Sequence, residues 1–346
     1  MRILITGAAG LYGVHLVDEL VKKDYVSRVI GVDDFSRPFA VDDVFFSCPE
    51  LAKKFLLMRG RFQDISVENF DAWDIDVVVH LAAGVSIPES MNRPEDYFFN
   101  NEYGTFKLIH TLVKTKKHPT FIYASSPEVY GNPCYVPMDI NHPMDPRSTY
   151  AVTKLAAEKH CKAIHDWYGY PVTIVRNFNT YGENQNTEDY SAVTPAFIKN
   201  ALLGEPLRIE GDGTQTRDFM YVRDAVNAYT TIIEKPQESL GQIFNIGTGK
   251  QTCIRELAET IVDLANSSSP IIYAPGRTVD LFSLEADISK TTQLTGWVPK
   301  FTLREGLRRV IDWYNKFVLC PANAERAYAV VPLKRATVQH VVSNKS

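Results

Sequence analysis

The sequence predicts an α/β protein built on a doubly wound parallel sheet, with a smaller mixed α/β lobe in its C-terminal half. Through the first half of the chain, short apolar runs alternate with amphipathic segments of helical period, as in parallel strands joined by crossover helices. After about residue 179 this regularity fades into helical segments separated by loops rich in glycine, proline and polar residues. A chain of 346 residues also exceeds what one hydrophobic core usually serves, which favours two lobes.

The apolar runs are the expected strands, because strands of a parallel sheet are buried on both faces and lack polar alternation. They comprise Ile3–Ile5, Val29–Val32, Val77–Leu81, Phe121–Ala124 and Val172–Val175. Two of the segments between them, Val14–Lys22 and Gly104–Lys114, carry apolar residues at helical spacing. We expect these two segments to be crossover helices.

Composition excludes several classes of function. Apolar residues make up 45% and charged residues 23% of the chain, and the net charge of −4 predicts neither a nucleic-acid nor a membrane surface. The five cysteines are scattered and the eight histidines lack metal-ligand spacing, so we expect a cytoplasmic protein without a metal. Since no stretch is apolar enough to span a membrane and the first strand starts at once, we also expect no signal peptide.

A glycine-rich loop follows the first expected strand and opens the first helix. Gly7, Gly10 and Gly13 form the pattern GxxGxxG. One glycine allows a sharp turn, one lets the backbone approach a pyrophosphate, and one permits close packing of helix and strand. The alternative is a tight turn without a ligand. Asp33 and Asp34 at the end of the second strand favour a dinucleotide, and their charge favours NAD over NADP.

A tyrosine and a lysine lie one helical turn apart in the motif YAVTK. A cation near Tyr150 would stabilise its phenolate, and Lys154 on the same face of the helix supplies one. This spacing alone is common on helices. Ser125 and Ser126, however, end an expected strand at the edge where doubly wound sheets carry their chemistry. Ser126 is expected to relay a proton, whereas a helix-capping role suits Ser125 better.

Taken in order, the motifs resemble those of the extended short-chain dehydrogenase/reductases, specifically the NAD-dependent nucleotide-sugar epimerase/dehydratase family with its Rossmann-type sheet. UDP-glucose 4-epimerase-like proteins are the most similar in pattern, and the resemblance covers about residues 1–317. The motifs that carry it are GAAGLYG at 7–13, the acidic pair at 33–34, QDI at 63–65, HLAA at 80–83, NxxGT at 101–105, SSPEVYG at 125–131, YAVTK at 150–154, RNFNTYG at 176–182, GDGTQTRDFMYVRD at 211–224 and NIG at 245–247.

The resemblance implies an NAD-binding domain over residues 1–179, to which about 220–248 return. It also implies a mainly substrate-binding lobe over 180–318 and a peripheral tail over 319–346. The positions implied to contact NAD are Gly7, Gly10, Leu11, Tyr12, Gly13, Asp33, Asp34, Asp64, Ile65, Leu81, Ala82, Ala83, Asn101, Ser125, Tyr150 and Lys154. Those implied to bind the substrate are Ser126, Asn179, Arg217 and Arg277. An alternative for Arg217 is a structural ion pair with Asp218 or Asp224.

Members of this family open by oxidising the sugar, usually at C4, while NADH stays bound. The resemblance therefore implies an enzyme, in the first place a UDP-sugar 4-epimerase. Glu128 keeps other outcomes open, because a base for the C5 proton would support dehydration of the 4,6 or 5,6 type. UDP-glucuronate decarboxylases also carry a glutamate at this position. A carboxylate bonded only to backbone or solvent is the structural interpretation of Glu128.

Departures from the family pattern rank these outcomes. Pro127 stands where 4,6-dehydratases carry the acid, which places dehydration second. Glu285 stands where decarboxylases have an arginine, which places decarboxylation third. Asn177 replaces the aromatic residue that many epimerases carry in RYFN. A non-enzymatic NAD-binding sensor or scaffold is the remaining hypothesis, although such a protein would not need Tyr150, Lys154 and Ser126.

The resemblance also implies a homodimer formed through a four-helix bundle. The helices expected to form it are Gly104–Lys114 and Thr153–Trp167. The second helix carries an apolar stripe at helical spacing, consisting of Ala156, Ala157, Cys161 and Ile164. The same stripe would equally suit packing within one chain.

Overall fold

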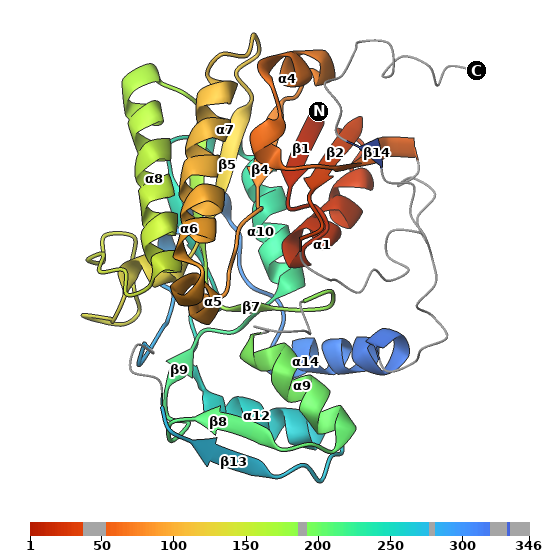
Figure 1. Ribbon diagram of the computed structural model, residues 1–346, viewed down its shortest axis with the longest axis vertical. Coiled ribbons are helices and arrows are strands. Elements are labelled where there is room, and N and C mark those ends of the chain that lie inside the picture. The colour runs from red at the N-terminus through yellow and green to blue at the C-terminus, as the bar shows by residue number, and fades with distance from the viewer. Residues whose placement is uncertain (37–52, 186–191, 277–280, 319–330, 333–346) are drawn as a thin grey trace.

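The protein is described by a computed structural model over residues 1–36, 53–185, 192–276, 281–318 and 331–332 (Figure 1). Within these ranges the main sheet has eight parallel strands in the order β14-β3-β2-β1-β4-β5-β6-β11. The strands are β1 (Arg2–Thr6), β2 (Arg28–Asp33), β3 (Phe55–Arg59), β4 (Val77–His80), β5 (Thr120–Ser125), β6 (Val172–Asn177), β11 (Ile243–Ile246) and β14 (Val331–Pro332). The predicted doubly wound sheet is therefore confirmed.

Side chains of each strand alternate between two cores, one on each face of the sheet. In β1, Ile3 and Ile5 belong to one core and Leu4 to the other, and all three are fully buried. The five strands expected from the sequence are all present, although Leu81 lies one residue beyond β4. Strands β3, β11 and β14 were not predicted.

Helices cover both faces of the sheet (Figure 1). Residues of α1 and α10 fill the core that contains Ile3, and residues of α4, α7 and α8 fill the core that contains Leu4. The helices of this half are α1 (Leu11–Val21), α4 (Val67–Trp73), α5 (Ile87–Asn92), α6 (Pro94–Tyr97), α7 (Gly104–Leu112), α8 (Thr149–Tyr168), α10 (Val222–Glu234) and α11 (Pro236–Ser239), with the π-helical turn η2 (Phe98–Tyr103) and the 3₁₀ turns η1 (Phe62–Asp64) and η3 (Pro127–Tyr130).

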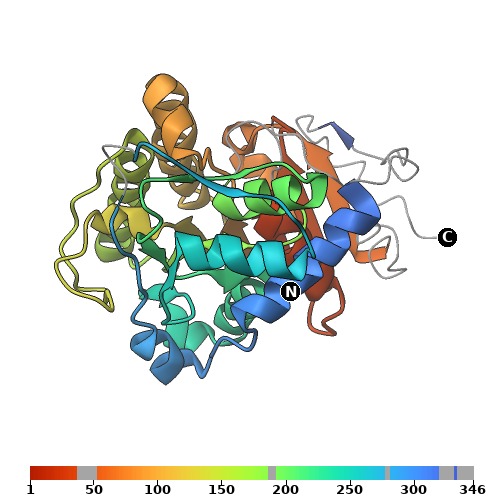
Figure 2. The same cartoon turned by 90° about the horizontal axis from the view of Figure 1, so that it is seen from below.

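Three two-stranded sheets and four further helices make up most of the remaining structure; of these, α9, α12, α14, β8, β9 and β13 are drawn below the main sheet in Figure 1. Helices α9 and α12 lie side by side, green and cyan in Figure 2, and α14 packs against α12. These elements are β7 (Thr180–Tyr181), α9 (Val193–Leu203), β8 (Leu207–Glu210), β9 (Thr216–Arg217), β10 (Met220–Tyr221), β12 (Thr252–Cys253), α12 (Ile254–Leu264), β13 (Ile271–Ala274), α13 (Ser289–Thr295) and α14 (Leu303–Trp313), which the turn η4 (Tyr314–Val318) follows.

The strand order reverses direction between β1 and β4, since β2 and β3 follow on one side and β5 and β6 on the other. In a doubly wound sheet, the loops after two such strands diverge and leave a crevice at their carboxyl ends. This arrangement brings the loops after β1, β4, β5 and β6 to one edge of the sheet.

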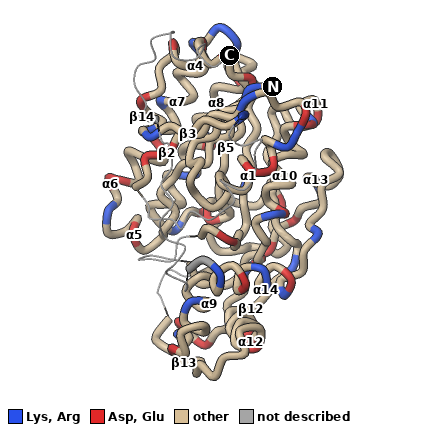
Figure 3. Tube along the Cα trace, turned by 90° about the vertical axis from the view of Figure 1, so that its right-hand side faces the viewer, with Lys and Arg blue, Asp and Glu red and all other residues tan. Residues whose placement is uncertain are grey.

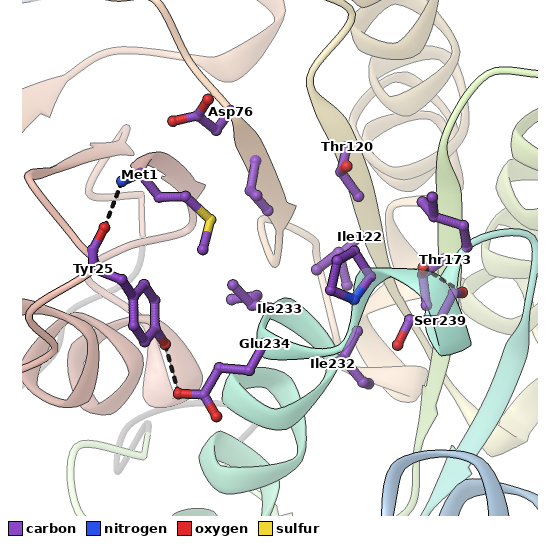
Figure 4. Close-up of a pocket in the computed structure, with 13 residues that line it drawn as sticks. Met1, Tyr25, Asp76, Thr120, Ile122, Thr173, Ile232, Ile233, Glu234 and Ser239 are labelled. Carbon is purple, nitrogen blue, oxygen red and sulfur yellow. Dashed lines mark hydrogen bonds between the residues drawn. The ribbon is translucent and has the colours of Figure 1, made fainter.

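A pocket of about 480 Å³ lies at the opposite, amino edge of the sheet (Figure 4). Its two carboxylates already have partners: Asp76 bonds the ammonium of Lys117 at 2.8 Å, and Glu234 accepts from the hydroxyl of Tyr25 at 2.8 Å. The walls include Val77 and Ile122, which are 6% and 1% exposed. This pocket is a crevice between packed elements, at the end of the strands opposite to the loops after β1, β4, β5 and β6.

Charged residues of both signs are interspersed along the tube in Figure 3. Within the described ranges there is no cluster of histidine, cysteine, aspartate or glutamate side chains suited to a metal ion. Nor does any helix there combine the length and apolarity needed to cross a bilayer.

Candidate active site

The glycine loop joins β1 to α1 with its backbone pressed against the next loop. Gly7 has φ +71°, and a Cβ added to it would lie 2.7 Å from the backbone nitrogen of Ala82. A Cβ on Gly13 would lie 2.3 Å from the carbonyl oxygen of Gly7. Gly10 differs, because its Cβ would have 3.4 Å to the nearest atom. Two glycines thus permit close packing, whereas a Cβ on Gly10 would make only an ordinary van der Waals contact.

The N-terminus of α1 suits a phosphate group. Gly10 is the N-cap residue, and within the described chain no side chain caps this helix end. Leu11 and Tyr12 form the first turn, which contains no acidic residue. Unpaired N–H groups and the positive end of the helix dipole therefore remain for an anion. The residues present fit the pyrophosphate of a dinucleotide.

The two carboxylates that end β2 have different surroundings. Asp33 accepts from the backbone nitrogens of Ala9 at 3.0 Å and Phe35 at 2.8 Å, so it lies against the glycine loop. Burial raises its pKa, and these two bonds oppose the rise. Asp34 is exposed and accepts from the backbone nitrogen of Ser36. Asp33 is therefore the carboxylate positioned to meet a ribose.

Replacing Asp33 with asparagine is expected to weaken NAD binding by about 10- to 100-fold, because hydrogen bonds to charged groups contribute ~1.5–3 kcal/mol. Binding of NADP is expected to weaken much less, since the repulsion of its 2′-phosphate also disappears. Dissociation constants for both cofactors test this. Asp34→Asn makes the same change on the exposed neighbour and is expected to weaken NAD binding far less. An unaltered NAD-to-NADP ratio in Asp33→Asn would contradict the assignment.

The loop after β4 faces the glycine loop and is held in place by Asn101. Asn101 is 1% exposed; its oxygen accepts from the backbone nitrogen of Gly84 at 2.8 Å, and its nitrogen donates to the Gly84 carbonyl at 2.9 Å. The π-helical turn η2, a geometry frequent at functional sites, carries this residue. Asn101 thus anchors the loop that contains Leu81, Ala82 and Ala83. Its geometry indicates a positioning role beside the implied cofactor contact.

Nearby, the turn η1 ends at Asp64 and is followed by Ile65, the two residues implied to meet adenine. Asp64 is exposed and Ile65 is buried, so of the two only Asp64 presents its side chain at the surface. Gln63 precedes them, is 8% exposed, and donates to Asn100 at 3.0 Å.

The predicted catalytic tyrosine and serine meet at the carboxyl end of β5. Tyr150 begins the first turn of α8 and is 8% exposed. Burial raises its pKa to about 12, a hydrogen bond with Ser126 opposes the rise, and the charge of Glu128 adds to it. Ser126 has the extended backbone expected before a proline. Its hydroxyl also caps η3 by accepting from the backbone nitrogen of Glu128, so the capping role expected for Ser125 falls on Ser126.

Lys154 lies behind this pair and is 4% exposed. Its ammonium donates to the carbonyl of Ala124 at 2.8 Å and lies 5.1 Å from the ring centre of Tyr123. Burial lowers its pKa to about 8, while the charge of Glu158 opposes the change. The bond to Ala124 places the charge at the end of β5, beside the two serines.

Two polar atoms of the site are buried without a hydrogen-bond partner among the described residues. They are the hydroxyl of Ser125 and the side-chain oxygen of Asn179. Leaving such a group unpaired costs ~1–3 kcal/mol, so we expect each of these atoms to form a hydrogen bond with a bound ligand. Both residues belong to the sets implied to bind cofactor or substrate.

Of the two arginines implied to bind the substrate, Arg217 lies within the described residues. Arg217 is half-buried in β9 and donates to the carbonyl of Thr216 at 2.8 Å. Asp218 accepts from the backbone of residues 248, 249 and 286, and Asp224 from that of 300 and 301. Both carboxylates therefore serve loop structure. Arg277 lies outside the described residues.

Sequence reasoning missed Tyr229, which lies on α10 and is fully buried. Its hydroxyl donates at 3.0 Å to Asn177, the residue noted only as a departure from the family pattern. Its ring packs edge-on against Tyr12, with centroids 6.2 Å apart. A tyrosine in an amphipathic helix gives no sign of such a role, because the same pattern is typical of core packing.

Comparison with known proteins agrees with this geometry. The profile of the NAD dependent epimerase/dehydratase family matches residues 3–247. A putative UDP-glucose 4-epimerase of Methanocaldococcus jannaschii is 32% identical over 90% of this chain and 97% of its own. A dTDP-D-glucose 4,6-dehydratase of Bos taurus is 31% identical over 96% of this chain and 94% of its own.

Among solved structures, the UDP-glucuronic acid 4-epimerase of Bacillus cereus, in complex with UDP-glucuronic acid and NAD, superposes with a TM-score of 0.82. It is 30% identical, and the match covers 91% of this chain and 99% of that one. The chain is an NAD-dependent enzyme and belongs to the NAD-dependent epimerase/dehydratase family.

Proposed function

We propose that this enzyme is a UDP-sugar 4-epimerase that works through a transient 4-keto-sugar. The observation that carries the proposal is the placement of Ser126, Tyr150 and Lys154 at the carboxyl end of β5. Ser126 follows that strand, and Lys154, one turn after Tyr150 on α8, donates to the Ala124 carbonyl at 2.8 Å. NAD, held by the glycine loop and Asp33, would supply the acceptor for a hydride from the sugar carbon and the donor for its return. Tyr150 takes the proton of the sugar hydroxyl, Ser126 orients that hydroxyl, and Lys154 supplies positive charge.

The residues after Ser126 support epimerisation over dehydration. Elimination of water needs an acid at the leaving hydroxyl, and Pro127, which is buried, has no proton to donate. Glu128 is half-buried and close enough to raise the pKa of Tyr150. A 5,6- or 4,6-dehydratase that uses Glu128 as base for the C5 proton is the second candidate. The named 4-epimerases among the similar proteins support the first.

Incubation with a panel of UDP-, dTDP- and GDP-sugars in deuterated water tests the proposal. NMR and mass spectrometry of the products are expected to find a C4 stereoisomer of unchanged mass, without deuterium at C5. Loss of water or deuterium at C5 would instead make Glu128 a base and overturn the epimerase assignment. Preference for UDP-sugars over the other two carriers is part of the same expectation.

We further propose that two copies of the chain form a dimer through helices α7 and α8. Of the apolar stripe predicted on α8, Ala157, Cys161 and Ile164 pack in the core on one face of the sheet, and Ala156 is half-buried. Support comes instead from aromatic side chains on the outer face. Phe99, Tyr103, Phe106 and His160 follow one another there, with neighbouring rings 5.0–6.4 Å apart.

Phe99→Glu is expected to turn the dimer into a monomer, because it places a charge in the apolar centre of the proposed contact. Sedimentation equilibrium measures the change. Tyr273→Glu is a matched control, since Phe99 and Tyr273 are both 54% exposed and Tyr273 lies on β13 in the other lobe. A dimer that survives Phe99→Glu, or is lost with Tyr273→Glu, would contradict the proposed surface.

We also propose a cytoplasmic location. Cys134, Cys161 and Cys253 are free thiols within the described chain. Free thiols persist in a reducing compartment, where structural disulfides are rare.

A further inference from the structure

One side chain ties helix α10 to the end of β5. Asn177, the last residue of β6, donates to the carbonyl of Ser125 at 3.0 Å and accepts from the hydroxyl of Tyr229 at 3.0 Å. Tyr229 is fully buried, and its ring lies edge-on to Tyr12 in the first turn of α1. Two hydrogen bonds through Asn177 therefore link α10 to the end of β5, the strand after which Ser126 follows.

Three successive residues at this strand end make contacts in the site. The carbonyl of Ala124 accepts from Lys154, and the carbonyl of Ser125 accepts from Asn177. Ser126 lies beside Tyr150 and opposes the rise in the pKa of that phenol. A shift of the strand end would therefore move Ser126 relative to Tyr150 on α8. Reaction geometry is sensitive to displacements of about 1 Å, which can change rates by ~10²-fold.

We infer that Tyr229 is a positioning residue for the Ser126–Tyr150 pair and acts through Asn177. The inference rests on the proposed function and deepens it. It also accounts for Asn177, which occupies a position that is aromatic in many epimerases. In this chain the aromatic ring belongs to Tyr229 of α10. The amide of Asn177 links that residue to Ser125 through the two hydrogen bonds described above.

Tyr229→Phe removes the hydroxyl and keeps the ring. We expect kcat with the best nucleotide sugar to fall about tenfold with KM little changed, because a buried acceptor loses its donor. In the NAD-bound enzyme, amide hydrogen exchange is expected to quicken in the peptide spanning 125–131 and to stay unchanged at the amino edge of the sheet. This second readout does not depend on turnover.

Tyr170→Phe is the matched control. Tyr170 is 3% exposed, and its hydroxyl also donates one buried hydrogen bond, to the carbonyl of Pro119 at 2.7 Å, at the opposite edge of the sheet. This variant is expected to lose thermal stability as Tyr229→Phe does, while kcat and exchange over 125–131 stay as in the wild type. A merely structural role of Tyr229 would make the two variants alike.

A double-mutant cycle tests the route through Asn177. In the background of Asn177→Ala, Tyr229→Phe is expected to add no further loss of kcat and no further exchange. Losses that multiply, or unchanged exchange over 125–131 in Tyr229→Phe, would overturn the inference. If the wild type turns over no nucleotide sugar, the proposed function fails, while hydrogen exchange in the NAD-bound variants still decides the inference.

Discussion

Replacing Tyr150 with phenylalanine is expected to lower kcat by about 10³-fold, because the general base that takes the sugar proton is lost. The ring remains, so its edge-on packing against Tyr97 and the position of α8 are preserved. NAD is expected to stay bound, since the glycine loop and Asp33 are untouched. Steady-state kinetics and an NAD dissociation constant separate the two effects.

The pH profile adds a second test of Tyr150. Burial raises its pKa to about 12, so the phenol holds its proton at neutral pH and the active phenolate becomes more populated as pH rises. The rate of sugar oxidation by the wild type is therefore expected to increase with pH, and Tyr150→Phe is expected to lose this limb. Tyr97→Phe is the control, because it removes a neighbouring buried hydroxyl that donates to Glu89. This variant is expected to keep the rise in rate with pH. A Tyr150→Phe enzyme within tenfold of wild type would contradict the assigned role.

Gly13→Ala is expected to abolish useful NAD binding and to destabilise the fold. The new Cβ would lie 2.3 Å from the Gly7 carbonyl oxygen and 2.6 Å from backbone atoms of Ala8, and backbone cannot move aside as a flexible side chain can. Overpacking of this kind costs ~1–3 kcal/mol or more, and ~3 kcal/mol corresponds to about 10²-fold in affinity. Thermal unfolding and NAD titration measure the two losses.

Gly10→Ala separates packing from cofactor contact in the same loop. Its Cβ would have 3.4 Å to the nearest atom, so the fold is expected to tolerate it. If Gly10 faces the pyrophosphate, NAD affinity falls while the unfolding temperature stays near that of the wild type. Equal losses of stability in both variants would show that the loop is a structural turn only.

Five strands could be predicted because each is a continuous apolar run, which is the local mark of burial on both faces. Strand β11, by contrast, is only Ile243–Ile246, and its partner β6 is distant in sequence. Asn245 interrupts its apolar run, so local pattern identifies neither the strand nor its neighbour. Strand β3, Phe55–Arg59, does carry a continuous apolar run and was nevertheless not predicted; it lies toward one side of the sheet.

The residues of the candidate site also fall into two groups: those that local spacing predicts and those that depend on contacts distant in sequence. Tyr150 and Lys154 share one helical turn, and Ser126 follows one strand, so local spacing was enough to propose them. Tyr229 reaches Asn177 across a separation of 52 residues, and no local pattern encodes that bond. The apolar stripe on α8 had two interpretations of equal local merit, and only its packing against the sheet distinguished them.

The fate of the hydrogen at C4 tests the central claim most directly. A UDP-sugar that the enzyme turns over, deuterated at C4, is incubated in ordinary water and the product is examined by NMR and mass spectrometry. Removal and return of a hydride by the same bound cofactor predicts a C4 epimer that keeps the whole of its deuterium at C4. Loss of the label to solvent, or a product that lacks water and is not a C4 epimer, would contradict the account.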